Sequence, residues 1–165
     1  MCFIVWVIIK WGEYMEWSEV LDNPLLRDLP FKIELNKFGK LLMSPASNEH
    51  GRIQSRLAAA LLNQLPKGEV ITECSVQTSD GVKVAHVAWL SEEFVDEFGF
   101  VTPYPKAPEL CIEIVSPSNS NIEIQSKVDL YLAKGAIEVW VAYDLNIIHI
   151  FSCLGRIKQS KVVCI

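Results

Sequence analysis

One acidic residue, Glu113, interrupts an apolar stretch that reads Leu-Cys-Ile-Glu-Ile-Val over residues 110–115. A segment that is apolar on both faces is typical of a central strand covered on both sides. A carboxylate there costs several kcal/mol unless it is paired, bound to a metal or protonated. Glu113 is therefore the first candidate for a functional residue. The alternatives are a strand-end carboxylate open to solvent, or one paired with a nearby lysine.

Two histidines are candidates for the same site. His86 is the lone polar residue of the segment 84–89, where a neutral imidazole suits a metal ligand or a general base, although such a histidine is often a hydrogen-bonded core residue. His50 lies in the first turn of a predicted helix, on the face of Ile53 and Leu57, so we expect it to point toward the sheet. The alternative for His50 is a residue held by a local hydrogen bond.

Lys127 and Glu34 are less specific candidates. Lys127 borders the apolar face of a second predicted helix, from where it can reach toward the end of the strand that carries Glu113. Its alternative is an exposed ion pair with Glu123, four residues earlier. Glu34 lies on the polar face of an alternating segment, where it either reaches the same cleft or contacts solvent.

The surrounding pattern predicts elements of both kinds. In chain order we expect a helix at 16–21, a hairpin at 31–35 and 41–43, a helix from Asn48 as cap to about Leu65, a hairpin at 69–77 and 82–90, a surface excursion at 91–107, a strand at 109–115, a helix at 122–134, and strands at 138–142, 147–151 and 161–165. This order predicts a mixed β-sheet flanked by two helices, in the α/β (α+β) class.

Composition limits the class of protein further. The chain has 165 residues, about one domain, and its net charge of −5 counts against tight non-specific binding to nucleic acid. An acidic metal site with a local basic rim stays compatible with that charge. The five cysteines show no CxxC spacing, which predicts reduced thiols in a cytoplasmic protein rather than disulfides or a zinc site.

The N-terminal segment is almost wholly apolar over residues 1–9, too short for a membrane span of about 20 residues. It also lacks the basic residues that precede the apolar run of a signal peptide. Two interpretations stay open, a strand that packs on the domain or a non-native extension with Met15 as the true start. We therefore expect an extension at 1–15 and a single domain at 16–165. The apolar end at 162–165 leaves a longer natural tail open.

Several short motifs together resemble the Uma family of restriction endonucleases. They are Met43-Ser44-Pro45-Ala46-Ser47 with His50, Ala85-His86-Val87-Ala88-Trp89, Pro108-Glu109-Leu110, Glu113-Ile114-Val115-Ser116-Pro117-Ser118, and the segments 127–131 and 135–140. The resemblance spans about residues 16–155. It implies a restriction-endonuclease-like fold of the PD-(D/E)XK type, Mg²⁺-dependent hydrolysis of phosphodiester bonds in DNA, no membrane partner and, by analogy, a homodimer.

The resemblance also implies roles for individual residues. Glu113 matches the acidic residue of the family's central strand, Lys127 the lysine on the following helix, His50 the histidine at the start of the first long helix, and Glu34 the glutamate of the first hairpin, an accessory position. His86 is a departure, because the family has its main metal-binding aspartate there. Mg²⁺ prefers oxygen ligands, whereas imidazole suits Mn²⁺ better. The implied metal pair, Glu113 and His86, is thus impaired for Mg²⁺.

Three functions follow as hypotheses. The leading one is a metal-dependent endonuclease with catalytic residues Glu113, Lys127, His86 and His50, whose weak Mg²⁺-dependent cleavage His86→Asp would restore. The alternative is a catalytically inactive nuclease-fold protein that binds nucleic acid or a protein partner. A third is a hydrolase acting on another small substrate in the same cleft, since a fold does not fix its chemistry.

Overall fold

The computed structural model describes residues 14–27, 29, 31–45, 47–117 and 119–163. Most of the expected extension at 1–15 therefore lies outside the described residues, as do Cys2 and Cys164. Within the described part, eight strands form one sheet in the order β2-β1-β4-β5-β6-β7-β8, and β3 also pairs with β4. Only the β5–β6 pairing is parallel among these described strands, which makes the sheet mixed, as the sequence predicts.

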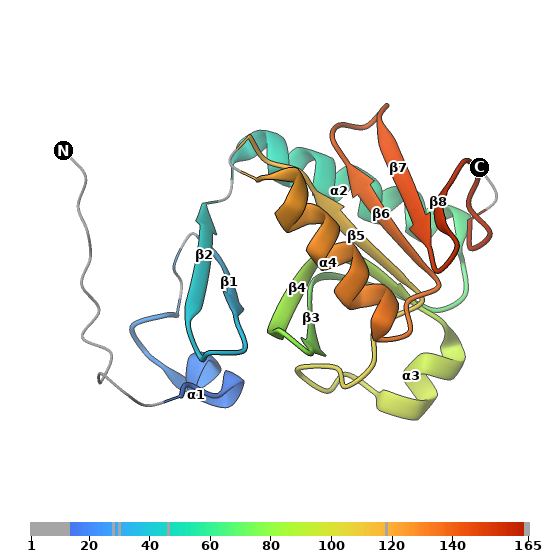
Figure 1. Cartoon of the computed structure of the whole chain (residues 1–165). Coiled ribbons are helices and arrows are strands. Elements are labelled where there is room, and N and C mark those ends of the chain that lie inside the picture. Colours follow the sequence, from blue (N-terminus) through green and yellow to red (C-terminus); the bar gives the residue numbers. More distant parts are fainter. Residues whose placement is uncertain (1–13, 28, 30, 46, 118, 164–165) are drawn as a thin grey trace.

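Figure 1 shows the elements in chain order. They are α1 (Trp17–Asp22), β1 (Phe31–Leu35), β2 (Leu41–Pro45), α2 (Asn48–Gln64), β3 (Glu69–Thr78), β4 (Gly81–Leu90), α3 (Glu92–Phe98), β5 (Leu110–Ile114), α4 (Asn121–Ala133), β6 (Glu138–Ala142), β7 (Ile148–Ser152) and β8 (Gly155–Ile157). Among the helices of the described residues, none has both the length and the apolar character of a membrane span.

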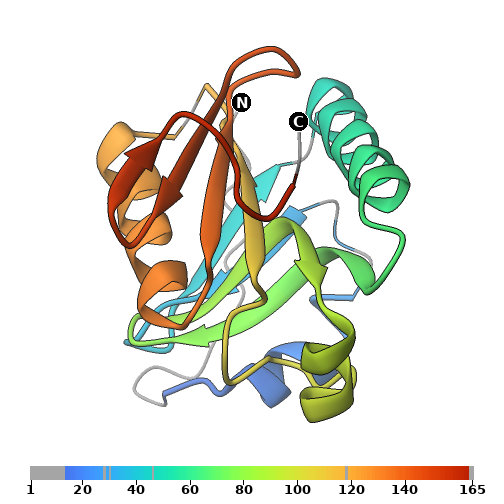
Figure 2. The same ribbon diagram turned by 90° about the vertical axis from the view of Figure 1, so that its right-hand side faces the viewer.

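The two long helices cover opposite faces of the sheet, as Figures 1 and 2 show together. The α2 side chains of Ile53, Leu57 and Leu61 pack in one cluster with Leu110, Ile112 and Ile114 of β5. The α4 side chains of Ile124, Val128 and Tyr131 pack in another cluster with Cys111 of β5. Successive residues of a strand point to opposite faces, so Glu113 lies on the face of Cys111, under α4.

Two strands, β1 and β5, pair with different parts of the same edge of β4 and diverge between these parts. We call this divergence the fork. β3 pairs along nearly the whole of β4, so β1 and β5 share its other edge. β1 pairs there through Leu35 opposite Val82, and β5 pairs through residues 87–89. The stretch 83–86 between these pairings faces the gap where β1 and β5 diverge. His86 is the last residue of that stretch.

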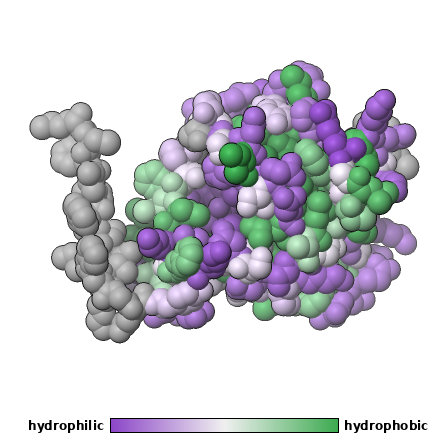
Figure 3. All heavy atoms as spheres, in the orientation of Figure 1, coloured by the Kyte–Doolittle hydropathy of each residue, from purple (hydrophilic) through white to green (hydrophobic). Residues whose placement is uncertain are grey.

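The β1–β2 hairpin carries apolar side chains on its outer surface, visible in Figure 3. Phe31, Phe38 and Met43 are among the exposed hydrophobic residues there. Phe31 also lines the pocket at the fork. The hairpin therefore presents an apolar rim beside the gap between β1 and β5.

Some sequence-based boundaries are wrong. Ser47, not Asn48, caps α2, because its hydroxyl accepts a hydrogen bond from the His50 amide. The stretch 91–107 contains α3, which Ser91 caps through the Phe94 amide. The strand β8 was not expected.

The expected strand at 161–165 is also wrong over 161–163, and residues 164 and 165 lie outside the described part. These residues bend because the buried Glu138 carboxylate accepts hydrogen bonds from the Ser160 hydroxyl and the Lys161 amide. Among the described residues, Cys74 and Cys111 are buried free thiols and Cys153 is an exposed one.

Candidate functional site

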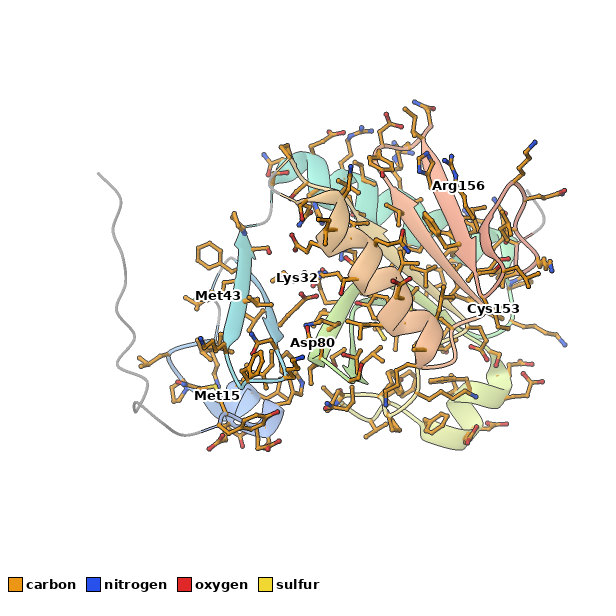
Figure 4. The ribbon with its side chains drawn as sticks, in the orientation of Figure 1. Met15, Lys32, Met43, Asp80, Cys153 and Arg156 are labelled. Atoms are coloured by element: carbon orange, nitrogen blue, oxygen red, sulfur yellow. The ribbon has the colours of Figure 1, made fainter. Side chains whose placement is uncertain are left out.

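A pocket of about 330 Å³ opens at the fork between β1 and β5. Its polar lining residues come from seven different elements and the loop after β5: Lys32, Ser44, His50, Gln54, Glu73, His86, Glu113, Ser116, Asn119 and Lys127. Figure 4 shows Lys32 extending from β1 toward the rest of the sheet and α4. The fold thus brings together Glu113, His86, His50 and Lys127, four of the five candidates of the sequence, in one pocket.

Glu113 is 1% exposed, and its carboxylate is fully paired. The Tyr131 hydroxyl donates to Oε1 over 2.8 Å, and the ammonium groups of Lys32 and Lys127 lie 3.4 and 3.7 Å from Oε2. Burial on its own would raise the pKa of Glu113, but Lys32, Lys127 and His86 together hold that pKa well below its ordinary value. Glu113 is therefore a buried carboxylate that stays ionised.

Glu34 and Lys127 form a buried ion pair next to Glu113. Lys127 Nζ donates to Glu34 Oε1 over 2.8 Å, and the amide of Val84 donates to the same oxygen over 3.0 Å. The alternatives of a solvated Glu34 and of an exposed Glu123–Lys127 pair are wrong. Burial alone would lower the pKa of Lys127, but Glu113 and Glu34 raise it above its ordinary value, so the ammonium keeps its charge.

His86 connects the two sides of the fork. Its Nδ1 lies 2.9 Å from Glu113 Oε2 and 3.2 Å from the backbone nitrogen of Ile114. When Nδ1 carries a proton, it donates to the Glu113 carboxylate. When Nδ1 carries none, it accepts from the Ile114 amide. Either contact fixes His86 against the end of β5.

His50 stacks beside His86, with 4.4 Å between the ring centroids. Burial, together with the nearby His86 and Lys32, lowers the pKa of His50 to about 4. His50 is therefore neutral at pH 7 and able to accept a proton. The prediction that it points toward the sheet is confirmed.

Lys32 is the central residue that the sequence did not reveal. Its Nζ lies 3.3 Å from each ring nitrogen of His86, 3.4 Å from Glu113 Oε2 and 3.6 Å from Glu34 Oε1. Its side chain is only 9% exposed. The available signal was its position two residues before Glu34 on one face of a strand, but that pattern also fits a solvated lysine.

Tyr131 is a second residue of the site that the sequence did not single out. The structure adds the hydrogen bond of its hydroxyl to Glu113, and this burial and the Glu113 charge raise its pKa well above the ordinary value. A buried tyrosine hydroxyl usually finds a partner, which was the signal for this role.

A strained residue supports the site from β3. Glu73 has φ +55°, a left-handed conformation that is uncommon for a residue with a side chain. Gln54 of α2 donates from Nε2 to Glu73 Oε1 over 2.8 Å and to the His86 carbonyl over 2.9 Å. The regular β3–β4 pairing omits Glu73 and His86 and resumes on either side of them.

This interruption changes which way the side chains point. Ile71 and Cys74 both contact the cluster under α4, although residues three apart lie on opposite faces of a regular strand. The same holds for Ala85 and Ala88 across His86. The alternation of both strands thus shifts at the site, although the register of their pairing is the same on either side of Glu73 and His86.

The donor set does not suit the divalent ion that the resemblance implies. Within the described residues, no group of three or more His, Cys, Asp or Glu side chains is placed to hold a metal ion. The Lys32 ammonium lies among Glu113, His86 and Glu34, where an ion would have to sit. Mg²⁺ needs close oxygen ligands at about 2.0–2.1 Å. The arrangement present here therefore does not fit Mg²⁺.

The fold and site together define an α/β protein with a restriction-endonuclease-like fold, in which buried carboxylates and lysines meet at the end of a central strand. The chain belongs to the Uma2 family, whose description is "Putative restriction endonuclease", and the match covers residues 12–159. The resemblance inferred from the motifs is thus confirmed.

A solved structure shares the fold. It is a crystal structure of "a putative nuclease belonging to DUF820" from Anabaena variabilis, with a TM-score of 0.62 and 18% sequence identity. The similarity covers 78% of this chain and 73% of that one. No curated protein matches the chain.

Proposed function

We propose that this protein is a nuclease that acts on phosphodiester bonds of DNA in the cleft at the fork, with little or no cleavage that depends on Mg²⁺. The observation that carries the proposal is the buried cluster of two carboxylates and two lysines, formed by Glu34, Glu113, Lys32 and Lys127, beside a neutral histidine. Family membership supports the class of reaction. The proposal includes a cytoplasmic location and a homodimer. Analytical ultracentrifugation tests the homodimer.

The charged residues of the cleft and His50 support a simple mechanism of hydrolysis. Lys32 and Lys127 carry the positive charge that attracts a phosphate and stabilises charge on its non-bridging oxygens. Glu113 and Glu34 hold these ammonium groups in place. His50 is neutral at pH 7 and lies in the pocket, so it accepts the proton of a water that attacks phosphorus. As the water oxygen bonds to phosphorus, one phosphorus–oxygen ester bond of the DNA chain breaks, and the leaving oxygen takes up a proton from solvent.

The identity of residue 86 limits this activity. An aspartate there would add an oxygen donor and a negative charge next to Glu113 Oε2, both of which favour a hard divalent ion. His86 provides neither. We therefore expect little Mg²⁺-dependent cleavage by the wild type.

The test is cleavage of supercoiled plasmid DNA with Mg²⁺, Mn²⁺ or a chelator. We expect His86→Asp to raise Mg²⁺-dependent cleavage by about tenfold or more, and Glu113→Gln to abolish cleavage in both backgrounds. Lys83→Met is the matched control, because Lys83 is a buried lysine paired with Asp80 outside the pocket. Robust Mg²⁺-dependent cleavage by the wild type that His86→Asp destroys would overturn the proposal.

A second candidate function is a nuclease-fold protein that binds DNA without cutting it. The observation that favours it is the Lys32 ammonium, which gives the cleft positive charge in place of a metal. A DNA-binding titration at several salt concentrations decides, because phosphate contacts strengthen at low salt. No affinity at low salt would rule this function out.

A further inference from the structure

We propose that Lys32 is a resident cation that takes the place of a divalent metal ion in this cleft. The inference deepens the proposed function and rests on it only for the identity of the site. It makes Lys32, together with the residue at position 86, a determinant of how tightly the cleft binds a metal.

The position of the ammonium carries the inference. Nζ lies between 3.3 and 3.6 Å from His86 Nδ1, His86 Nε2, Glu113 Oε2 and Glu34 Oε1. These atoms include the Glu113 and His86 atoms that the resemblance assigns to the metal. An ion bonded to Glu113 and His86 at about 2.0–2.3 Å would lie within repulsive distance of this ammonium.

The charges of the cleft agree with this position. In the buried cluster, Glu34 and Glu113 supply two negative charges, and Lys32 and Lys127 supply two positive ones. Glu73 also lines the pocket, but it is exposed and accepts a hydrogen bond from Gln54 outside this cluster. The carboxylates are therefore already matched, and a divalent ion would leave the buried cluster with excess positive charge. Removing the charge of Lys32 leaves one carboxylate charge unmatched, which favours the binding of a cation.

The backbone keeps Lys32 where it is. Lys32 pairs with Ser44 of β2, so its strand is held from the outer side. On the inner side, Leu35 pairs with Val82 and the Glu34 carboxylate accepts from the Val84 amide. The ammonium is thus positioned by a strand anchored on both edges and not by a mobile surface chain.

The test measures binding of Mn²⁺ alone to the full-length chain, by electron paramagnetic resonance of the free ion. Lys32→Met keeps the length of the side chain and removes its charge, and we expect its Mn²⁺ affinity to exceed that of the wild type by about tenfold or more. His86→Asp should add to this gain in a double variant. Lys83→Met, which loses a buried ammonium elsewhere, should leave Mn²⁺ binding as weak as in the wild type.

A second measurement follows the stability of the wild type. A ligand that binds only the native state raises the free energy of unfolding. We expect millimolar Mn²⁺ to leave the urea unfolding midpoint of the wild type unchanged. Equal Mn²⁺ affinity of wild type and Lys32→Met, or a stabilisation of the wild type by Mn²⁺ that Glu113→Gln abolishes, would overturn the inference.

These readouts separate the two proposals. Mn²⁺ binding gained by Lys32→Met without cleavage of DNA by any variant would contradict the proposed nuclease function and support the resident cation. Tight Mn²⁺ binding by the wild type, with DNA cleavage, would contradict the resident cation and leave the nuclease function standing.

Discussion

Tyr131 of α4 donates a hydrogen bond from its hydroxyl to Glu113 Oε1 of β5, over 2.8 Å. Both side chains are almost fully buried, with 0% and 1% exposed. The bond joins the helix to the central strand at the base of the cleft. It also occupies the one Glu113 oxygen that neither lysine contacts, so the orientation of the carboxylate depends on it.

Tyr131→Phe should destabilise the protein by about 1–3 kcal/mol, because it leaves a buried charged oxygen without its donor. Urea unfolding followed by circular dichroism measures this change. Tyr143→Phe is the control, since Tyr143 is 41% exposed. Equal stability of the two variants would contradict the role assigned to the Tyr131 hydroxyl.

A double-mutant cycle should reveal strong coupling between Glu34 and Lys127. Lys127→Met should cost about 3–5 kcal/mol of unfolding free energy, because it leaves two buried carboxylates without one of their cationic partners. The double variant of Lys127→Met and Glu34→Gln should lose less unfolding free energy than the sum of the losses in the two single variants. The exposed Glu49–Arg52 pair, with side chains 62% and 53% exposed, is the control, with an expected coupling of about 0.2–1 kcal/mol. Coupling no larger than in this control would contradict the buried pair.

The sequence predicts the fold and part of the site for identifiable reasons. Glu113 stands out because every neighbour in its strand is apolar. The covering helices follow from the spacing of residues such as Ile53 and Leu57. Lys127 borders an apolar face, which is compatible with burial but does not require it.

The rest depends on contacts between distant segments. Lys32 and Glu34 look like the solvated face of a hairpin, and only contacts with distant residues such as Glu113 and Lys127 bury them. The left-handed backbone of Glu73 leaves no signal, because glutamate does not favour that conformation. His86 was identified as a departure, but its proximity to Lys32 depends on the fork between β1 and β5.

Stability should depend on pH through His50. Its pKa falls from 6.5 to about 4 on folding, so the unfolded chain binds a proton more readily between these values. The free energy of unfolding should therefore decrease as pH falls from about 6.5 toward 4. With allowance for the exposure of His50, we expect a loss of about 1–2 kcal/mol.

Urea unfolding of wild type and His50→Gln over this pH range measures the effect. The variant should lose this part of the pH dependence. The depressed pKa of Glu113 acts at lower pH, because its contribution is fully present above about 4.5 and is lost only below it. An unchanged pH profile in His50→Gln would contradict the assigned pKa.

The strain at Glu73 predicts that glycine is more stable than alanine at this position, the reverse of the usual order in a strand. Both Glu73→Gly and Glu73→Ala lose the contact with Gln54, but glycine adopts φ +55° without a steric cost. Glu73→Gly should therefore be more stable than Glu73→Ala by about 1 kcal/mol. At Gln77, an exposed residue of the same strand, alanine should be the more stable replacement. Alanine preferred at both positions would contradict the strained backbone.

Anomalous diffraction from Mn²⁺-soaked crystals of the wild type tests the central claim most directly, because it shows which cation lies beside Glu113 and His86. We predict the Lys32 ammonium at that position and no anomalous peak there. A Mn²⁺ ion within about 2.0–2.3 Å of both Glu113 and His86, with Lys32 displaced, would contradict the account.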